Sequence, residues 1–274
     1  MSTDELVKDT TENRKGEIIV FISGKGGVGK TVISVNTAVA LNNKGFSTCI
    51  LDGSFQFGDV NLAFDIQPRL TISDLVKENE SLEGIKIYDY LHIHDSGVSI
   101  LAAPPKPEYA DLVTTAVLPK VCEKILEKHE FLIVDLPSGL SELNLSFLEM
   151  ADRIFLVTDL EMAALKNSKA MLRTLRMLGM EKQIKVIVNR SDMEGLIKVN
   201  DVQDMLETDE LFTISNNFKV VSKSFNIGIP FVIGKPNEKI TNEIITIANE
   251  FHSNKPKSRR SQRKKQGFMS IFKR

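Results

Sequence analysis

Cysteine is scarce in this sequence, with only Cys49 and Cys122 among 274 residues. Two cysteines so far apart do not form the short-spaced pairs that bind zinc or a metal cluster, and they provide no disulfide framework. Cys49 lies in a strand pattern and Cys122 in a helix pattern, so we expect two buried thiols. This use of cysteine is typical of a cytoplasmic protein.

Long apolar runs are also absent. No stretch approaches the ~20 apolar residues needed to cross a bilayer, and the first residues include acids, unlike a signal peptide. Residues 1–16 are polar, and we expect them to be disordered. Hydrophobic residues make up 42% and charged residues 26%, a balance that predicts a globular protein with a substantial core.

The charge is unevenly distributed, although the net charge is only −1. Residues 251–274 contain nine Lys or Arg and no acid, which leaves 26 basic and 36 acidic residues in 1–250. An acidic body of net charge −10 therefore carries a tail of charge +9. Such a separation predicts an anionic partner for the tail, either a membrane surface or a nucleic acid.

A glycine-rich loop near the N-terminus is the most informative motif. It follows an apolar run at 18–22 that predicts a strand, and it opens into a helical pattern at 32–43. The spacing matches the phosphate-binding loop G-x-x-x-x-G-K-[ST] in its strand–loop–helix context. The loop consists of Gly24, Lys25, Gly26, Gly27, Val28, Gly29, Lys30 and Thr31.

The residue types of this loop suit a bound nucleoside triphosphate. Glycine lets the backbone wrap closely around a phosphate, and the N–H groups at a helix N-terminus attract an anion. We expect Lys30 to contact the β- and γ-phosphates and the Thr31 hydroxyl to bind Mg²⁺. The alternative is an ordinary glycine-rich turn between a strand and a helix, which the clear flanking elements disfavour.

Two aspartates that follow apolar strands are candidates for the same site. Asp52 ends a predicted strand at 47–51, and Asp135 ends the apolar run 131–134. At the carboxyl end of a strand beside the phosphate loop, Asp52 is placed for the Mg²⁺ shell or the attacking water. Asp135 is placed to hold a Mg²⁺-bound water. An aspartate after a strand is weak evidence alone, and the phosphate loop upstream strengthens it.

Strand and helix patterns alternate along the rest of the chain. This alternation predicts a doubly wound α/β fold, with a mostly parallel sheet and helices on both faces. No internal repeat or second core is evident, so we expect one domain over 17–252 and a separate tail over 253–274. Further strands are expected at 98–101, 131–135, 153–158, 184–189 and 211–214, and further helices at 71–78, 111–128, 161–178, 199–206, 217–225 and 240–252.

The early lysine of the loop adds a family resemblance. The run from Lys25 to Thr31 resembles the deviant Walker A motif of the ParA/MinD ATPases. The resemblance implies ATP and Mg²⁺ as cofactors, and an ATP-dependent homodimer in which Lys25 reaches the partner's phosphates. It also implies nucleotide switches at 53–61 and 136–139 and a contact from Asn189 to the adenine edge. The alternatives are a solvated loop cation at Lys25 and a turn-capping side chain at Asn189.

A longer stretch narrows the resemblance to one branch. Residues 56–60 read Gln-Phe-Gly-Asp-Val, similar to the run after the second strand of CpaE/TadZ proteins, which help to place Tad-type (Flp) pilus assembly machinery. The resemblance covers roughly residues 17–252. Many members of this branch carry a receiver-like domain before the ATPase, whereas this chain begins directly at the ATPase. The same branch is indicated by residues 135–137, 151–152, 188–190 and 220–230.

Ser54 departs from the family pattern. The family usually has Asp-x-Asp after the second strand, and the second aspartate helps to orient the attacking water. In this chain the run is Asp52, Gly53, Ser54. A hydroxyl group cannot supply the negative charge that polarises a water. We therefore expect ATP binding and dimerisation to persist while hydrolysis is slow.

The end of the tail combines apolar and basic side chains. Four apolar residues fall on one face of a helix, with cations beside them. Such a segment enters the interface of an anionic bilayer, and each nearby cation adds about 1 kcal/mol. It resembles the C-terminal membrane-targeting segment of MinD-type proteins, of which a dimer presents two copies. The residues are Phe268, Met269, Ile271 and Phe272, with Lys264 and Lys265 among the cations.

These features predict a cytoplasmic ATPase, attached peripherally to the inner face of the cell membrane, that positions a partner complex such as a pilus or secretion assembly. The alternatives are a MinD-type or flagellar-placement regulator, a scaffold that binds ATP without hydrolysing it, and a DNA-partition ATPase. For the tail itself, a solvated basic segment and a nucleic-acid-binding segment remain open. Iron-protein reductases are disfavoured because their cluster cysteines are missing, and tyrosine-kinase relatives because the tail contains no tyrosine.

Overall fold

A computed structural model describes residues 16–78, 84–208 and 210–251 of the chain. The N-terminal segment expected to be disordered lies outside the described residues, apart from Gly16. The basic tail at 253–274, with its proposed membrane-binding residues, also lies outside them. Among the described helices, none combines the length and the apolar character that crossing a membrane requires.

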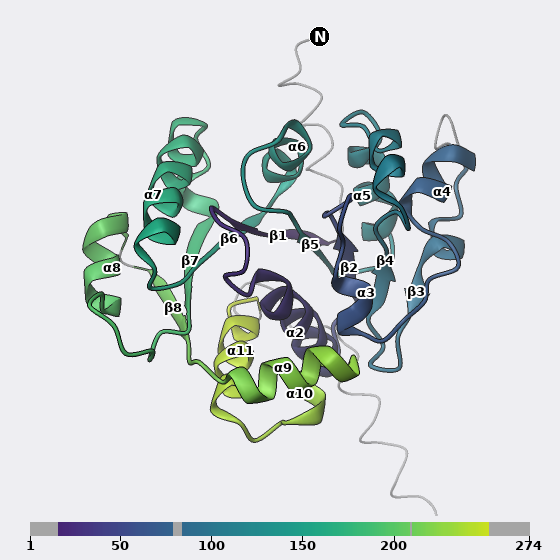
Figure 1. Cartoon of the computed structure of the whole chain (residues 1–274). Coiled ribbons are helices and arrows are strands. Elements are labelled where there is room, and N and C mark those ends of the chain that lie inside the picture. The colour runs from purple at the N-terminus through teal and green to yellow at the C-terminus, as the bar shows by residue number, and fades with distance from the viewer. Residues whose placement is uncertain (1–15, 79–83, 209, 252–274) are drawn as a thin grey trace, which may run out of the picture.

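The centre of the fold is an eight-stranded sheet (Figure 1). The strands are β1 (Glu17–Ser23), β2 (Thr48–Asp52), β3 (His92–Ile93), β4 (Ser99–Leu101), β5 (Phe131–Asp135), β6 (Arg153–Thr158), β7 (Ile184–Asn189) and β8 (Leu211–Ile214). Their order is β3-β4-β2-β5-β1-β6-β7-β8, and every pair is parallel except β3 with β4. The predicted doubly wound, mostly parallel sheet is therefore confirmed.

Helices cover both faces of this sheet (Figure 1). One face carries α2 (Lys30–Asn43), α3 (Val60–Ala63), α9 (Phe218–Ile227), α10 (Phe231–Gly234) and α11 (Lys239–Asn249). The other face carries α4 (Ile72–Glu78), α5 (Leu118–Leu126), α6 (Glu142–Met150), α7 (Met162–Met177) and α8 (Val199–Leu206). Short 3₁₀ turns lie at η1 (Ile87–Tyr90), η2 (Pro107–Leu112) and η3 (Glu181–Gln183).

The central strand β1 shows why its sequence is apolar throughout. Ile18 and Val20 point into the core on the α5–α8 face, whereas Ile19 and Phe21 point into the core on the α2 face. All four side chains are buried because successive residues of a strand face opposite sides of the sheet. A strand covered on both faces therefore requires an unbroken apolar run.

One predicted helix is wrong in its extent. The pattern at 111–128 predicts a single helix, but the structure has η2 followed by a break and then α5. Pro119 lies in the first turn of α5, where its missing N–H leaves no bond unmade. A proline is poorly tolerated farther inside a helix, so α5 begins next to it.

A further helix that the sequence pattern does not predict, α6, follows β5. Ser141 caps this helix, because its hydroxyl oxygen accepts a hydrogen bond from the backbone N–H of Asn144 at 3.1 Å. The same asparagine donates from its side chain to the carbonyls of Pro137 and Gly139. The start of α6 and the loop after β5 are therefore bound together, close to the candidate site.

Candidate functional site

The phosphate loop connects β1, in the middle of the sheet, to α2. Gly27 and Gly29 have φ angles of 81° and 90°, in the left-handed region that glycine adopts without strain. The N-terminus of α2 has no capping side chain and no acidic residue in its first turn. Its backbone N–H groups are therefore free of a protein anion, as a phosphate-binding helix terminus requires.

The side chain of Asn189, at the end of β7, is hydrogen-bonded to the phosphate loop. Its Nδ2 donates to the carbonyl oxygen of Val28 at 2.8 Å, and its Oδ1 accepts from the N–H of Arg190. A Cβ on Gly29 would lie 2.3 Å from the same Nδ2, so this close contact also requires glycine. The predicted contact from Asn189 to adenine stays a prediction, since the amide is engaged with the loop and its neighbour.

The side chains of Lys30 and Thr31 both contact that of Asp135 in the structure. Asp135 Oδ1 accepts from Lys30 Nζ at 3.0 Å, and Oδ2 accepts from the Thr31 hydroxyl at 2.7 Å. The Ser34 hydroxyl, one turn into α2, donates to Oδ1 at 3.1 Å. The Asp135 side chain is only 1% exposed, so these three donors satisfy a buried carboxylate.

Asp52 lies beside Asp135, since the two residues are paired in register on neighbouring strands. Its carboxylate is buried and accepts the backbone N–H groups of Ser54 and Val60, each at 3.1 Å. Burial, reinforced by the negative charge of Asp135, raises the pKa of Asp52 to about 7. By accepting these two N–H groups, Asp52 fixes the loop at residues 53–59. Its carboxyl group titrates near neutral pH.

This pKa predicts a pH-dependent difference in stability between the wild type and Asp52→Asn. A carboxyl group whose pKa is raised by folding stabilises the folded state most at pH values below its ordinary pKa of 3.8. This stabilisation is lost as the pH rises to the folded-state pKa of about 7. The substitution removes the titration, although it also loses one accepted hydrogen bond at every pH. In urea unfolding, the free energy of unfolding of the variant is expected to rise relative to that of the wild type, by at most about 1.4 kcal/mol per pH unit in this window. A difference that stays constant from pH 5 to pH 8 would contradict the raised pKa.

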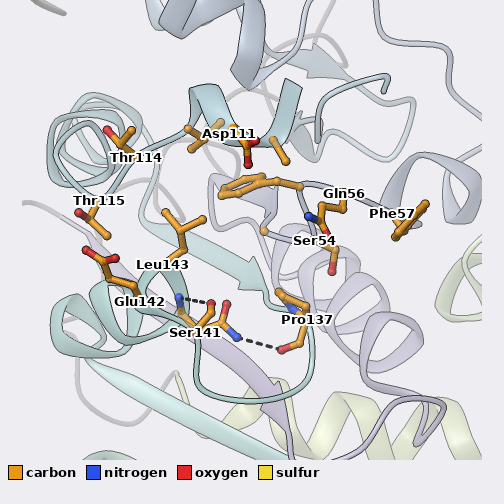
Figure 2. A pocket seen from close by; sticks show the side chains of 15 residues that line it. Ser54, Gln56, Phe57, Asp111, Thr114, Thr115, Pro137, Ser141, Glu142 and Leu143 are labelled. Carbon is orange, nitrogen blue, oxygen red and sulfur yellow. Dashed lines mark hydrogen bonds between the residues drawn. The ribbon is translucent and has the colours of Figure 1, made fainter. Parts of the chain in front are cut away.

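A pocket of about 630 Å³ lies between the two loops predicted to be switches (Figure 2). Residues 53–57 after β2 form one side, residues 137–144 form another, and the end of η2 with residues 113–115 completes it. None of its described lining residues belongs to the phosphate loop, so it is not the phosphate site. Ser54 is half-buried and lines this pocket.

Lys25 lies apart from the cluster around Asp135. It forms an ion pair with Glu161, which precedes α7, and both side chains are substantially exposed. The hydrogen bond between them raises the pKa of Lys25 and lowers that of Glu161. The phosphate loop thus presents two different lysines, one half-buried against Asp135 and one at an accessible rim.

Three contacts of the loop were not predicted. Glu161 pairs with Lys25, Asn167 Nδ2 donates to the carbonyl of Gly24 at 3.0 Å, and Arg190 donates to the carbonyl of Gly27 at 3.3 Å. Arg190 also pairs with Asp159 at 3.6 Å. Asp159, Glu161 and Arg190 lie just after the ends of β6 and β7, which was a signal in the sequence, whereas Asn167 lies within α7.

Large apolar side chains are exposed around the same edge of the sheet. They belong to the segments that follow the carboxyl ends of β2, β6 and β7, which is the edge where the phosphate loop lies. Phe57, in the loop after β2, is 77% exposed. Exposed apolar groups gathered at one edge are typical of a surface that is covered by a partner. The others are Met162, Met193 and Leu196.

A glycine loop between a central parallel strand and a helix, with a lysine and a threonine bound to the aspartate of the adjacent strand, defines a P-loop NTPase. Comparison with known proteins specifies the family. The model of the ParA family, described as NUBPL iron-transfer P-loop NTPase, matches residues 14–252. The chain belongs to this family.

Relatives of the chain include septum site-determining proteins. It is 28% identical over 236 residues to MinD of Bacillus subtilis, covering 81% of this chain and 84% of that protein. An uncharacterized ATP-binding protein of Methanocaldococcus jannaschii is 27% identical over 256 residues, covering 93% of this chain and 94% of that protein. The structure of Pyrococcus horikoshii MinD complexed with Mg-ADP superposes with a TM-score of 0.76 at 26% identity, covering 87% of this chain and 96% of that one.

The iron-transfer part of the family description has no evident counterpart in the described residues. Cys49 on β2 and Cys122 on α5 are both buried, and burial raises the pKa of Cys49 far above its ordinary value. The part of the chain that the structure describes has no group of three or more His, Cys, Asp or Glu side chains suited to a metal ion. The predicted magnesium site needs no such group, because phosphate, threonine and one aspartate suffice.

Proposed function

We propose that the protein is a slowly hydrolysing ATPase that dimerises around ATP, attaches to an anionic membrane and positions a partner complex. Its resemblance to the CpaE/TadZ branch favours a Tad/Flp-type pilus or secretion assembly as that complex. Membership of the ParA family supports the nucleotide chemistry, and the similarity to septum site-determining proteins supports a positioning role.

The residues present suit a nucleotide with Mg²⁺. The uncapped N-terminus of α2 and Lys30 would bind the phosphates, while Thr31 and Asp135 would hold the ion. Mg²⁺, when bound, neutralises charge on the β- and γ-phosphates. The relative from Pyrococcus horikoshii that was solved with Mg-ADP supports this assignment. Asp52 keeps the loop at 53–59 closed beside that site through its two accepted N–H groups.

The observation that carries dimerisation is the position of Lys25. The side chain of this lysine is 38% exposed and pairs with Glu161 at the rim, whereas Lys30 pairs with Asp135. A cation at an exposed rim is available to the phosphates of a second copy once Glu161 releases it. The exposed Phe57 and Met162 at the same edge supply apolar surface for that copy.

Substitution of Lys25 is expected to separate nucleotide binding from dimerisation. With ATP and Mg²⁺, light scattering of the wild type should give twice the monomer mass of 30.6 kDa. Lys25→Ala should bind ATP but stay at the monomer mass, because its own phosphate site keeps Lys30. Lys182→Ala, an exposed lysine before β7 at the opposite edge of the sheet, serves as the control and should dimerise. Full dimerisation of Lys25→Ala would contradict the proposal.

Membrane attachment is proposed for the tail at 253–274, which lies outside the described residues. Its support is chemical: the sequence places Phe268, Met269, Ile271 and Phe272 beside cations, and the body is acidic. A dimer presents two tails, so attachment becomes bivalent and dependent on nucleotide.

Two rival functions have specific support. The similarity to septum site-determining proteins favours a MinD-type regulator, whose activity depends on a partner protein. Ser54 favours a scaffold that uses ATP as a structural ligand without hydrolysing it. A DNA-partition function would instead bind the tail to phosphates, and its affinity would fall steeply with salt.

A further inference from the structure

A second cavity, which differs in its lining from the phosphate site, lies along the outer side of α9. Its volume is about 720 Å³, within the range of ligand-binding pockets. One wall is a face of α9, and the other is formed by Ile229, α10 and residues 235–238. Figure 1 shows α9 on the side of α2 that faces away from the sheet. We call this cavity the α9 groove.

The face of α9 that lines the groove follows the helical period. Lys219 and Val220, Lys223 and Ser224, and Ile227 recur at intervals of three and four residues and so share one side of the helix. The helix is ten residues long, so this stripe extends for about 15 Å. The groove is therefore elongated and parallel to a helix.

The lining of the groove is apolar at its base. Phe231 is buried beneath it, whereas Ile227 and Ile229 are 48% and 45% exposed. The Ser224 hydroxyl donates to the carbonyl of Ile229 at 2.6 Å, which fixes the turn between α9 and α10. Exposed isoleucines in a concave site favour the burial of apolar groups from a partner.

Lysines lie on both sides of this apolar base. Lys219 and Lys223 are one turn apart on α9, and Lys235 follows α10 on the opposite wall. All three are exposed, and none takes part in the ion pairs found among the described residues. The one lining acid, Glu238, accepts a hydrogen bond from Asn217 at 3.3 Å. The groove therefore presents unpaired positive charge, although the body of the chain is acidic.

We propose that the α9 groove binds an acidic amphipathic helix of a partner protein. Apolar side chains of that helix at intervals of three and four residues fill the base, and flanking Glu or Asp side chains pair with the three lysines. A bilayer is a poorer fit, because the isoleucines line a concavity while a membrane takes up protruding groups. A nucleic acid is a poorer fit too, because its phosphates leave the apolar base without a partner.

Binding of a helix in the α9 groove does not depend on the proposed function, because none of the described residues that line the groove belongs to the phosphate loop. It does place the partner close to the nucleotide. The opposite side of α9 contributes Phe218 and Val221 to a small pocket that also contains Gly29 and Asn189. A helix bound in the groove would thus contact an element that borders the phosphate loop.

The test uses the full-length protein and a labelled 15-residue peptide with leucines at intervals of three and four and glutamates beside them. A scrambled peptide of the same composition is the negative probe. Fluorescence anisotropy is expected to show binding of the amphipathic peptide, about tenfold weaker for Lys219→Glu/Lys223→Glu. A peptide with lysines for glutamates should recover binding to that variant. Lys86→Glu/Lys182→Glu, with the same charge change at two exposed lysines elsewhere, should bind like the wild type.

Isoleucine methyl spectra locate the bound peptide. The resonances of Ile227 and Ile229 are expected to shift on titration, whereas the resonance of Ile93, exposed on β3, should not. Equal binding of the scrambled peptide, equal weakening by the control charge changes, or unmoved Ile227 and Ile229 would overturn the proposal. It would also be overturned if duplex DNA or phosphatidylserine vesicles displaced the peptide and bound in a Lys219- and Lys223-dependent way.

Discussion

Lys30→Ala is expected to abolish ATP binding and to destabilise the fold. Lys30 is the proposed cation of the phosphate site, and in the structure its Nζ lies 3.0 Å from the buried Asp135 carboxylate. Removing one partner of a buried ion pair leaves an uncompensated charge, which costs about 3 kcal/mol. The full cost is expected at pH 8, above the pKa of Asp52. At that pH Asp52 has lost its proton, so the carboxylates of Asp52 and Asp135 repel each other.

Calorimetric titration with ATP-Mg²⁺ and urea unfolding measure the two effects separately. Lys25→Ala is the matched control, because it removes a lysine of the same loop that is exposed and bound to Glu161. The control should keep both ATP affinity and stability. Wild-type affinity for ATP in Lys30→Ala would place the phosphate site elsewhere.

Ser54→Asp is expected to raise ATP turnover by about a hundredfold, at the low end of what a positioned general base contributes. The substitution introduces the second carboxylate that the resemblance to the ParA/MinD ATPases leads us to expect at this position. Ser54 is half-buried beside the pocket between the two proposed switch loops, so there is room for a larger side chain (Figure 2). Its backbone N–H would still donate to Asp52, since the substitution leaves the main chain unchanged.

The control for this prediction is Ser54→Asn, which has the size of aspartate without its charge. It should hydrolyse ATP as slowly as the wild type, and all three proteins should bind ATP alike. A wild-type turnover on the order of 1 per second or faster would contradict the role given to Ser54. Equal rates for the Asp and Asn variants would show that charge at this position does not limit hydrolysis.

Strong local patterns predicted most of the fold. β8 and α8 have the predicted ends, and the apolar strand runs around β1, β5, β6 and β7 all became strands. Two errors concern helices in which a capping residue or a proline decides where the helix begins. The cap at Ser141 and with it the whole of α6 were not predicted, and Pro119 lies in the region that was predicted to be one helix.

Only those residues of the candidate site that belong to a recognisable sequence pattern could be predicted. Lys30 and Thr31 belong to the loop pattern and Asp135 follows an apolar strand run, so each was a candidate, whereas the hydrogen bonds between them are visible only in the structure. The pairing of Lys25 with Glu161 joins residues 136 positions apart, and only the folded sheet brings them together. The raised pKa of Asp52 likewise requires the register that sets it beside Asp135.

The most direct test of the proposed function is sedimentation with anionic vesicles. Full-length protein and a 1–254 truncation are each mixed with vesicles in ATP-Mg²⁺, in ADP-Mg²⁺ and without nucleotide. We predict that only the full-length protein with ATP pellets, because two tails in an ATP-joined dimer bind far more tightly than one. Pelleting that is independent of nucleotide would contradict the switch and leave a constitutive anchor, and no pelleting by either protein would contradict membrane attachment itself.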